Sequence, residues 1–125
     1  MPKKTKKILI IEDDVPIASA LDNKLTFSGY KTIVASDGQV GLEKALTISP
    51  DLILLDIIMP KMDGITMLEK LQKNKEGKKI PVIILTNLSD AEMVQKAKDN
   101  GVHDFLIKSD WRLEDVVKKI QEKIG

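Results

Sequence analysis

Short apolar segments and longer amphipathic segments alternate along the whole chain. The short segments are rich in β-branched residues, a pattern typical of strands that are buried on both faces of a parallel sheet. They are Ile8–Ile11, Thr32–Ala35, Leu52–Leu55, Val82–Leu85 and Phe105–Ile107. The pattern therefore predicts buried strands at these places, with a helix after each of them.

The longer segments repeat apolar residues at the three- and four-residue spacing of an amphipathic helix. The spacing is clearest near the end of the chain, and it recurs in the segments after the first and third strands. The apolar positions are Leu113, Val116, Val117, Ile120 and Ile124; Ile17, Leu21 and Leu25; and Ile65, Leu68 and Leu71. Each of these helices is expected to bury one face against the sheet.

Turn and capping residues lie between the predicted elements. Asp14 precedes Val15 and Pro16, which indicates an N-cap followed by a proline in the first helical turn. Gly29 and Gly101 stand where the first and fourth helices should end. Further N-caps are expected at Ser89 and Asp110, and a turn or cap at Asp63.

Alternating strands and helices imply a parallel sheet that carries helices on both faces and right-handed crossovers. The units follow one another without a linker or repeat, so residues 1–125 are expected to form a single domain. The fold class is α/β, a flavodoxin-like, doubly wound sheet with strand order 2-1-3-4-5 and five helices. In such sheets the functional crevice lies at the carboxyl ends of the strands, between strands one and three.

Charged and polar residues follow the strands at that crevice. The first strand leads into Glu12-Asp13-Asp14, the third into Asp56, the fourth into Thr86 and the fifth into Lys108. Carboxylates that converge on one spot repel each other unless a cation lies among them. Oxygen ligands without His or Cys favour a hard cation, and a few carboxylates with waters suit Mg²⁺.

This set of groups suits phosphoryl transfer. An ionised carboxylate is a nucleophile toward phosphorus and needs no general base. The reaction depends mainly on positioning and on cancelling charge at the phosphoryl oxygens, which a metal ion and a lysine both provide. The residues therefore indicate an aspartyl phosphate as the product.

Composition excludes several other classes of protein. The chain has no cysteine, which rules out disulfides, thiolate metal sites and a cysteine nucleophile. Its 20 basic and 19 acidic residues give a net charge of +1, which argues against a nucleic-acid-binding surface. The apolar run after the lysine-rich start is too short for a signal peptide or a membrane span. A cytoplasmic location without membrane contact is expected.

The run from Asp56 to Gly64, Asp-Ile-Ile-Met-Pro-Lys-Met-Asp-Gly, resembles the phosphoacceptor signature of response regulator receiver domains. The acidic pair after the first strand, Thr86 and Lys108 complete the set that this family uses. The resemblance covers essentially the whole chain. It implies a two-component signalling domain that catalyses only its own phosphorylation and dephosphorylation.

The resemblance also implies roles for single residues around the metal. Asp56 would accept the phosphoryl group, and Asp13 and Asp56 would ligate Mg²⁺ with the Ile58 carbonyl. Glu12 would hold the metal through water. The family uses two acids after the first strand; we assign Glu12 and Asp13, because Asp14 is better employed as the helix cap.

A switch and its partners follow from the same resemblance. Thr86 would hydrogen-bond the phosphoryl group, Lys108 would pair with it, and Phe105 would turn inward. The surface of the fourth helix, fifth strand and fifth helix would then change and bind a downstream protein or a second copy. A sensor histidine kinase or histidine phosphotransfer protein would dock near the first helix.

Three positions depart from the family's usual residues. Ser109 follows the conserved lysine where proline is common, Asn87 stands where a small residue is usual, and Phe105 lacks a tyrosine's hydroxyl. The first change is expected to alter the geometry of its loop, and the second to alter access to the phosphoryl group.

Other functions fit the sequence less well. One alternative is an interaction module, natural or engineered, that works without phosphorylation and has only inherited the motif. A Mg²⁺-dependent phosphatase of the haloacid dehalogenase type would need Asp-x-Asp after the first strand. A flavin-binding module would need a Ser/Thr-rich phosphate loop there. The chain is either a stand-alone regulator or part of a longer one.

Overall fold

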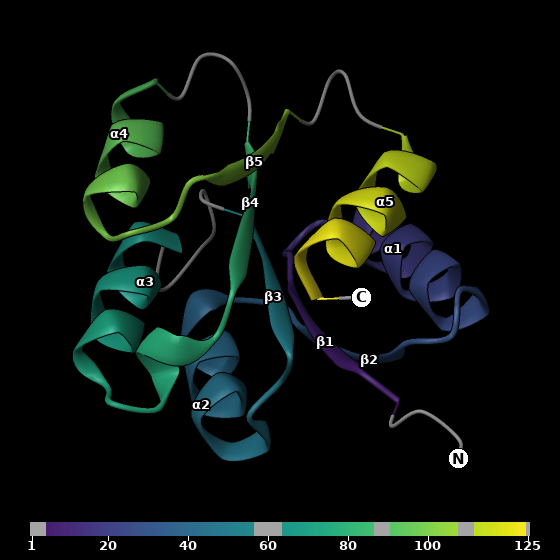
Figure 1. Cartoon of the computed structure of the whole chain (residues 1–125), viewed down its shortest axis with the longest axis horizontal. Coiled ribbons are helices and arrows are strands. Elements are labelled where there is room, and N and C mark those ends of the chain that lie inside the picture. Colours follow the sequence, from purple (N-terminus) through teal and green to yellow (C-terminus); the bar gives the residue numbers. More distant parts are fainter. Residues whose placement is uncertain (1–4, 57–63, 87–90, 108–111, 125) are drawn as a thin grey trace.

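The structure is a computed structural model that describes residues 5–56, 64–86, 91–107 and 112–124. Strands and helices alternate through these residues (Figure 1). The strands are β1 (Lys7–Ile11), β2 (Lys31–Ala35), β3 (Leu52–Asp56), β4 (Val82–Thr86) and β5 (Asp104–Ile107). The helices are α1 (Val15–Phe27), α2 (Gly38–Ile48), α3 (Gly64–Lys73), α4 (Ala91–Asp99) and α5 (Leu113–Ile124). A short 3₁₀ helix, η1 (Gly77–Lys79), was not predicted.

The five strands form one parallel sheet in the order β2-β1-β3-β4-β5. This confirms the flavodoxin-like α/β fold and its doubly wound topology. All five predicted strands are present, and their ends are aligned by the register. Ile11 pairs with Leu55, and Thr86 pairs with Ile107. The residues that follow these ends therefore lie along one edge of the sheet.

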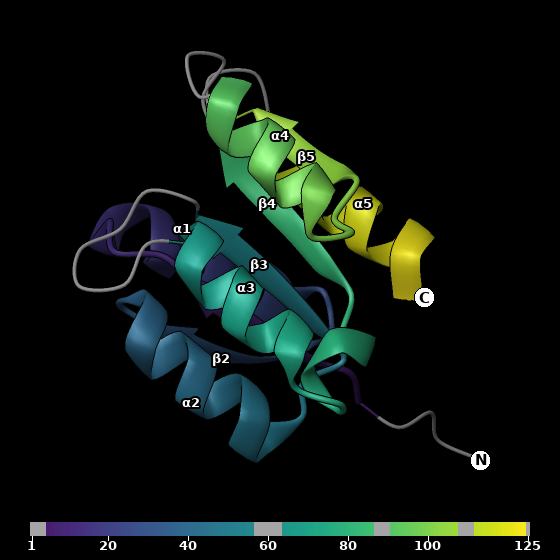
Figure 2. The ribbon, with the colours of Figure 1, turned by 90° about the vertical axis from the view of Figure 1, so that its left-hand side faces the viewer.

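Helices cover both faces of the sheet. The apolar residues of α1 and α5 pack on one face, against alternate residues of β1, β3 and β4. The apolar residues of α2, α3 and α4 pack on the other face (Figure 2). Strands β1, β3 and β4 are buried almost throughout, because each is flanked by two strands and covered on both sides.

The predicted helix faces are the buried ones. Leu21 and Leu25 of α1 are fully buried, as are Leu68 and Leu71 of α3. In α5 the most buried of the predicted positions is Ile120, at the centre of the apolar face. Among the described helices, none is long and apolar enough to cross a membrane.

Capping residues fix where the helices begin and end. Asp14 is extended, and its side chain accepts a hydrogen bond from the Ile17 N–H at 3.1 Å, as expected of an N-cap. Gly29 and Gly101 have φ of 101° and 86°, a left-handed conformation that favours glycine at a helix end. The expected caps at Ser89, Asp110 and Asp63 lie outside the described residues.

Candidate functional site

The acidic residues after β1 lie beside the end of β3. The Glu12 N–H donates to the Ala35 carbonyl at 3.0 Å, which continues the β1–β2 ladder by one residue. Asp56 is the last residue of β3, and Ile11 pairs with Leu55 just before it. Because β1 and β3 are neighbours, the carboxylates at their ends meet even though they are far apart in sequence.

Three carboxylates form one cluster at this edge. Oxygen atoms of Glu12, Asp13 and Asp56 all lie within 4.8 Å of one another. Glu12 and Asp56 are buried, with 1% and 6% of their surface exposed, whereas Asp13 is exposed. Hard oxygen donors that close together, open to solvent on one side, fit a hard divalent cation that keeps some of its waters. The cluster therefore could hold Mg²⁺, as the sequence suggested.

Asp14 does not belong to the cluster. Its carboxylate caps α1 instead, and the described acidic group consists of the other two acids and Asp56. The geometry thus separates three consecutive acids into two kinds: one that stabilises a helix end, and two that face β3. This is the division expected from Pro16 in the first turn of α1.

Thr86 ends the strand next to β3. It is buried, with 4% of its surface exposed, and lies one position beyond Leu85, the residue that pairs with Asp56. Thr86 thus lies at the same edge of the sheet as the carboxylate cluster, one position beyond the level of Asp56. Lys108 and the Ile58 carbonyl lie outside the described residues, as do Asn87 and Ser109.

Thr86 and Phe105 line the same groove. This groove has a volume of about 370 Å³ and lies between α4 and the end of β5. Its walls include Val94 and Lys98 of α4, and the Lys98 ammonium lies 6.0 Å from the centre of the Phe105 ring. The half-buried Phe105 ring therefore borders a space that the Thr86 side chain also borders.

Two residues of this region were missed from the sequence. Asp37 is buried and caps α2 by accepting a hydrogen bond from the Val40 N–H at 2.9 Å. The Asp37 cap could have been predicted from the sequence, because an aspartate between a strand and a helix is a common N-cap. Lys98 gave no such signal, since its contact with Phe105 depends on how α4 lies against β5.

A parallel sheet of this order, with an acidic cluster at the switch in strand order, defines a doubly wound α/β domain with a candidate cation site. Residues 8–121 match the family model of the response regulator receiver domain. The chain belongs to this family.

The relatives of this chain include transcriptional regulators. The chain is 34% identical over 115 residues to the DNA-binding dual master transcriptional regulator RpaA of Synechocystis, a match that covers 92% of this chain and 47% of that protein. It is 38% identical over 103 residues to the alkaline phosphatase synthesis regulatory protein PhoP of Bacillus subtilis, covering 82% and 42%. The chain thus spans about half the length of these curated relatives.

Solved structures share the whole fold. The chemotaxis protein CheY4 of Vibrio cholerae superposes with a TM-score of 0.87 at 27% identity, covering 98% of this chain and all of that one. The comparison agrees with the observed strand order and with helices on both faces. The chain is therefore a receiver domain of two-component signalling.

Proposed function

We propose that the chain accepts a phosphoryl group on Asp56 in the presence of Mg²⁺ and thereby changes its α4–β5–α5 surface. The observation that carries this proposal is the cluster of Glu12, Asp13 and Asp56, whose oxygens lie within 4.8 Å of one another. The chain then acts as a signalling domain whose only reaction is its own phosphorylation and dephosphorylation.

The donor set supports a resident Mg²⁺ ion. Asp13 and Asp56 would bind it directly with the Ile58 carbonyl, and Glu12 would hold it through water. When bound, the ion neutralises charge on the phosphoryl oxygens and so reduces their repulsion from the carboxylates. The buried position of Glu12 favours an indirect role, because its side chain lies deeper than that of the exposed Asp13.

Asp56 supplies the nucleophile. One of its carboxylate oxygens attacks phosphorus, a new O–P bond forms, and the bond from phosphorus to the donor's leaving group breaks. The leaving group departs with the electron pair of that bond. The rigid end of β3 holds the carboxylate in place, which lowers the entropy cost of reaching the reactive geometry.

Thr86 and Lys108 respond to the new phosphoryl group. The Thr86 hydroxyl donates a hydrogen bond to a phosphoryl oxygen, and the Lys108 ammonium pairs with another. Movement of Thr86 leaves room in the groove that Phe105 borders. The Phe105 ring then turns inward and the surface of α4, β5 and α5 changes, which is a two-state switch driven by a local charge.

The partners are proposed from the family. A sensor histidine kinase or a histidine phosphotransfer protein docks beside α1, close to the carboxylates. A downstream protein or a second copy binds the α4–β5–α5 surface. Residues 1–125 act as one domain, in the cytoplasm, without contact to nucleic acid or membrane.

The experiment is incubation with acetyl phosphate and Mg²⁺, followed by intact-mass measurement beside Asp56→Asn. We expect one phosphoryl group on the wild type and none on the variant. A second arm uses beryllofluoride, and NMR shifts are expected at Thr86 and Phe105. No adduct and no shift in either arm would reject phosphorylation and leave an interaction module that works by binding alone.

A further inference from the structure

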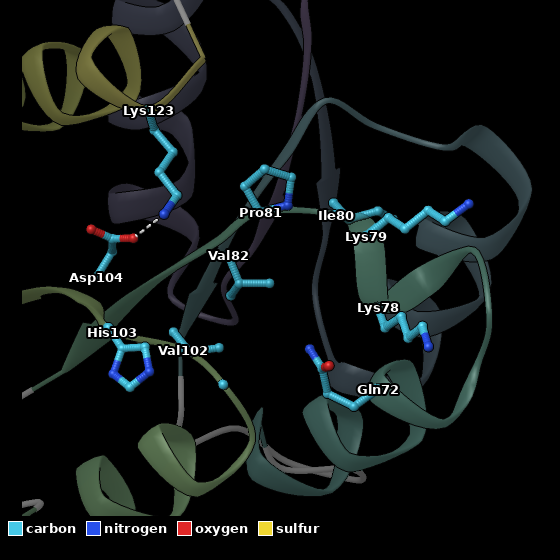
Figure 3. Close-up of a pocket in the computed structure, with 11 residues that line it drawn as sticks. Gln72, Lys78, Lys79, Ile80, Pro81, Val82, Val102, His103, Asp104 and Lys123 are labelled. Atoms are coloured by element: carbon cyan, nitrogen blue, oxygen red, sulfur yellow. Dashed lines mark hydrogen bonds and ion pairs between the residues drawn. The ribbon is translucent and has the colours of Figure 1, made fainter.

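A second cavity lies at the end of the sheet opposite the carboxylates. Its walls come from the starts of β4 and β5, the end of α3, η1 and the last turn of α5 (Figure 3). Its volume is about 260 Å³, slightly below the roughly 300–1,000 Å³ of typical ligand pockets. A ligand that fills this cavity is small and stays partly exposed to solvent. The segments that build the cavity are distant in sequence, so no local pattern in the chain predicts it.

The rim of the cavity is positively charged. Lys78 and Lys79 stand on one side and Lys123 on the other, with Asp104 as the acid among the described lining residues (Figure 3). Asp104 already pairs with Lys123 at 2.5 Å and with Lys119 at 3.8 Å. Its charge is therefore offset by two lysines, and the rim keeps a positive excess.

The two η1 lysines are available to a ligand. Lys79 has an exposed ion pair with Glu76 at 3.8 Å, a kind of contact that contributes little. Lys78 has no ion pair to any other part of the described structure. In Figure 3 both side chains extend outward from the rim, so a bound anion would draw their ammonium groups toward the mouth of the cavity.

The C-terminal ends of helices near the cavity carry partial negative charge, which opposes the positive charge of the lysines. A helix C-terminus is equivalent to about half a negative charge, and the effect falls off within the last turn. At the end of α4 much of this partial negative charge is cancelled, because the Lys98 and Ala97 carbonyls accept hydrogen bonds from the N–H groups of Gly101 and Val102. The full charges of the lysines therefore dominate the rim.

The inner wall suits an apolar, planar group. Val82 and Val102 are buried beneath the opening, and Pro81 borders it. Figure 3 shows the His103 ring beside Val102 and the Gln72 amide across from it. An amide can donate and accept hydrogen bonds at the edge of a ring, and an imidazole can stack on its face.

We propose that this cavity binds a small organic phosphate with a planar body, of the size of a mononucleotide. The phosphate lies between the ammonium groups of Lys78 and Lys79, and the planar body lies on Val82 and Val102. Binding involves neither the carboxylate cluster nor phosphorylation, so this proposal stands or falls separately from the proposed function.

The test is an NMR titration of the full chain with AMP, without Mg²⁺ or phosphodonor. We expect the amide signals of Gly101, Val102 and His103 to move, and those of Asp13 and Asp56 to stay. Adenosine, which lacks the charge, and inorganic phosphate, which lacks the planar body, should each bind at least about tenfold more weakly, since about 1.4 kcal/mol is tenfold in affinity. Raising the salt from about 0.01 M to about 0.15 M should weaken AMP binding, because screening shortens the reach of exposed charges.

Lys78→Gln is the test variant and Lys75→Gln is its matched control. Lys75 lies in the same connection between α3 and β4 and is exposed, but it does not line the cavity. We expect Lys78→Gln to weaken AMP binding about tenfold, the loss of one charge-assisted contact, and Lys75→Gln to leave it unchanged.

The proposal is overturned by equal loss in both variants, by equal binding of AMP and adenosine, or by no movement of the cavity signals. Inorganic phosphate that binds as tightly as AMP would also reject it, because the planar body would then contribute nothing. Both variants change exposed side chains, and an unaltered spectrum outside the cavity shows that they are folded.

Discussion

Gly41 of α2 lies directly against the side chain of Ile11 at the end of β1. A Cβ atom at position 41 would be 2.5 Å from Ile11 Cδ1 and 2.8 Å from Cγ1, closer than side chains approach. The absence of a side chain thus lets α2 pack tightly on the strand that leads into Glu12.

Gly41→Ala should destabilise the fold. The added methyl group forces Ile11 from its place in a close-packed core, and overpacking of this kind typically costs about 1–3 kcal/mol. The measurement is urea unfolding of the variant beside the wild type. In an Ile11→Val background, which removes the nearest atom, Gly41→Ala should cost less. An equal cost in both backgrounds would show that Ile11 is not the cause.

Neutralising the clustered acids should weaken Mg²⁺ binding. Asp13→Asn removes the negative charge of a proposed direct ligand, so we expect a loss of affinity of about tenfold or more. Glu12→Gln should have a smaller effect, because Glu12 is proposed to act through water. Calorimetric titration with Mg²⁺ measures both.

Asp14→Asn is the matched control for this series. It removes the same charge from the neighbouring position, and asparagine is as good an N-cap as aspartate. Mg²⁺ affinity should therefore change little. A loss as large as that of Asp13→Asn would mean that general charge, rather than ligation, determines the binding.

Thr86→Ala should separate phosphorylation from the switch. Asp56 keeps its place and still accepts the phosphoryl group, but the hydroxyl that would pull on the α4–β5 groove is gone. We expect an unchanged mass increase with acetyl phosphate and reduced NMR shifts at Phe105 and Lys98. Thr86→Ser, which keeps the hydroxyl, should retain the shifts. Full shifts in Thr86→Ala would reject this switch.

Tyr30 should make stability depend on pH in alkaline solution. Burial raises the pKa of Tyr30 above its ordinary value of 10.0. The unfolded chain therefore loses the phenolic proton first. The contribution of the buried phenol to stability is complete below pH 10.0 and falls as the pH rises through the raised pKa.

Tyr30→Phe isolates this effect from other groups that titrate in the same range. Denaturant unfolding of both proteins just below and well above pH 10.0 gives the comparison. The free energy of unfolding should fall more steeply for the wild type than for the variant. Parallel pH profiles would show that the Tyr30 phenol makes no such contribution.

Much of the fold could be predicted from local pattern. All five strands, the buried faces of α1, α3 and α5, and the Asp14 cap were expected from periodicity and capping chemistry. These features were predictable because periodicity and capping involve residues that are close together in the sequence. The η1 helix was missed because its three residues carry no periodic signal.

The candidate site was predictable for a different reason. Glu12, Asp13, Asp56 and Thr86 each follow a buried strand, and parallel strands end at one edge of their sheet. Knowing the strand order was therefore enough to bring the residues together. The metal ligand set, the role of Lys108 and the conformational readout remain proposals.

By itself the sequence determined which segments are strands and helices, their order in the sheet and the family to which the chain belongs. Only the tertiary structure decided how Lys98 meets the Phe105 ring and that a basic cavity forms around Lys78. The physical reason is that periodicity reports which face of a segment is buried. Contacts between segments depend instead on helix position and side-chain packing, which arise only when the whole core is assembled.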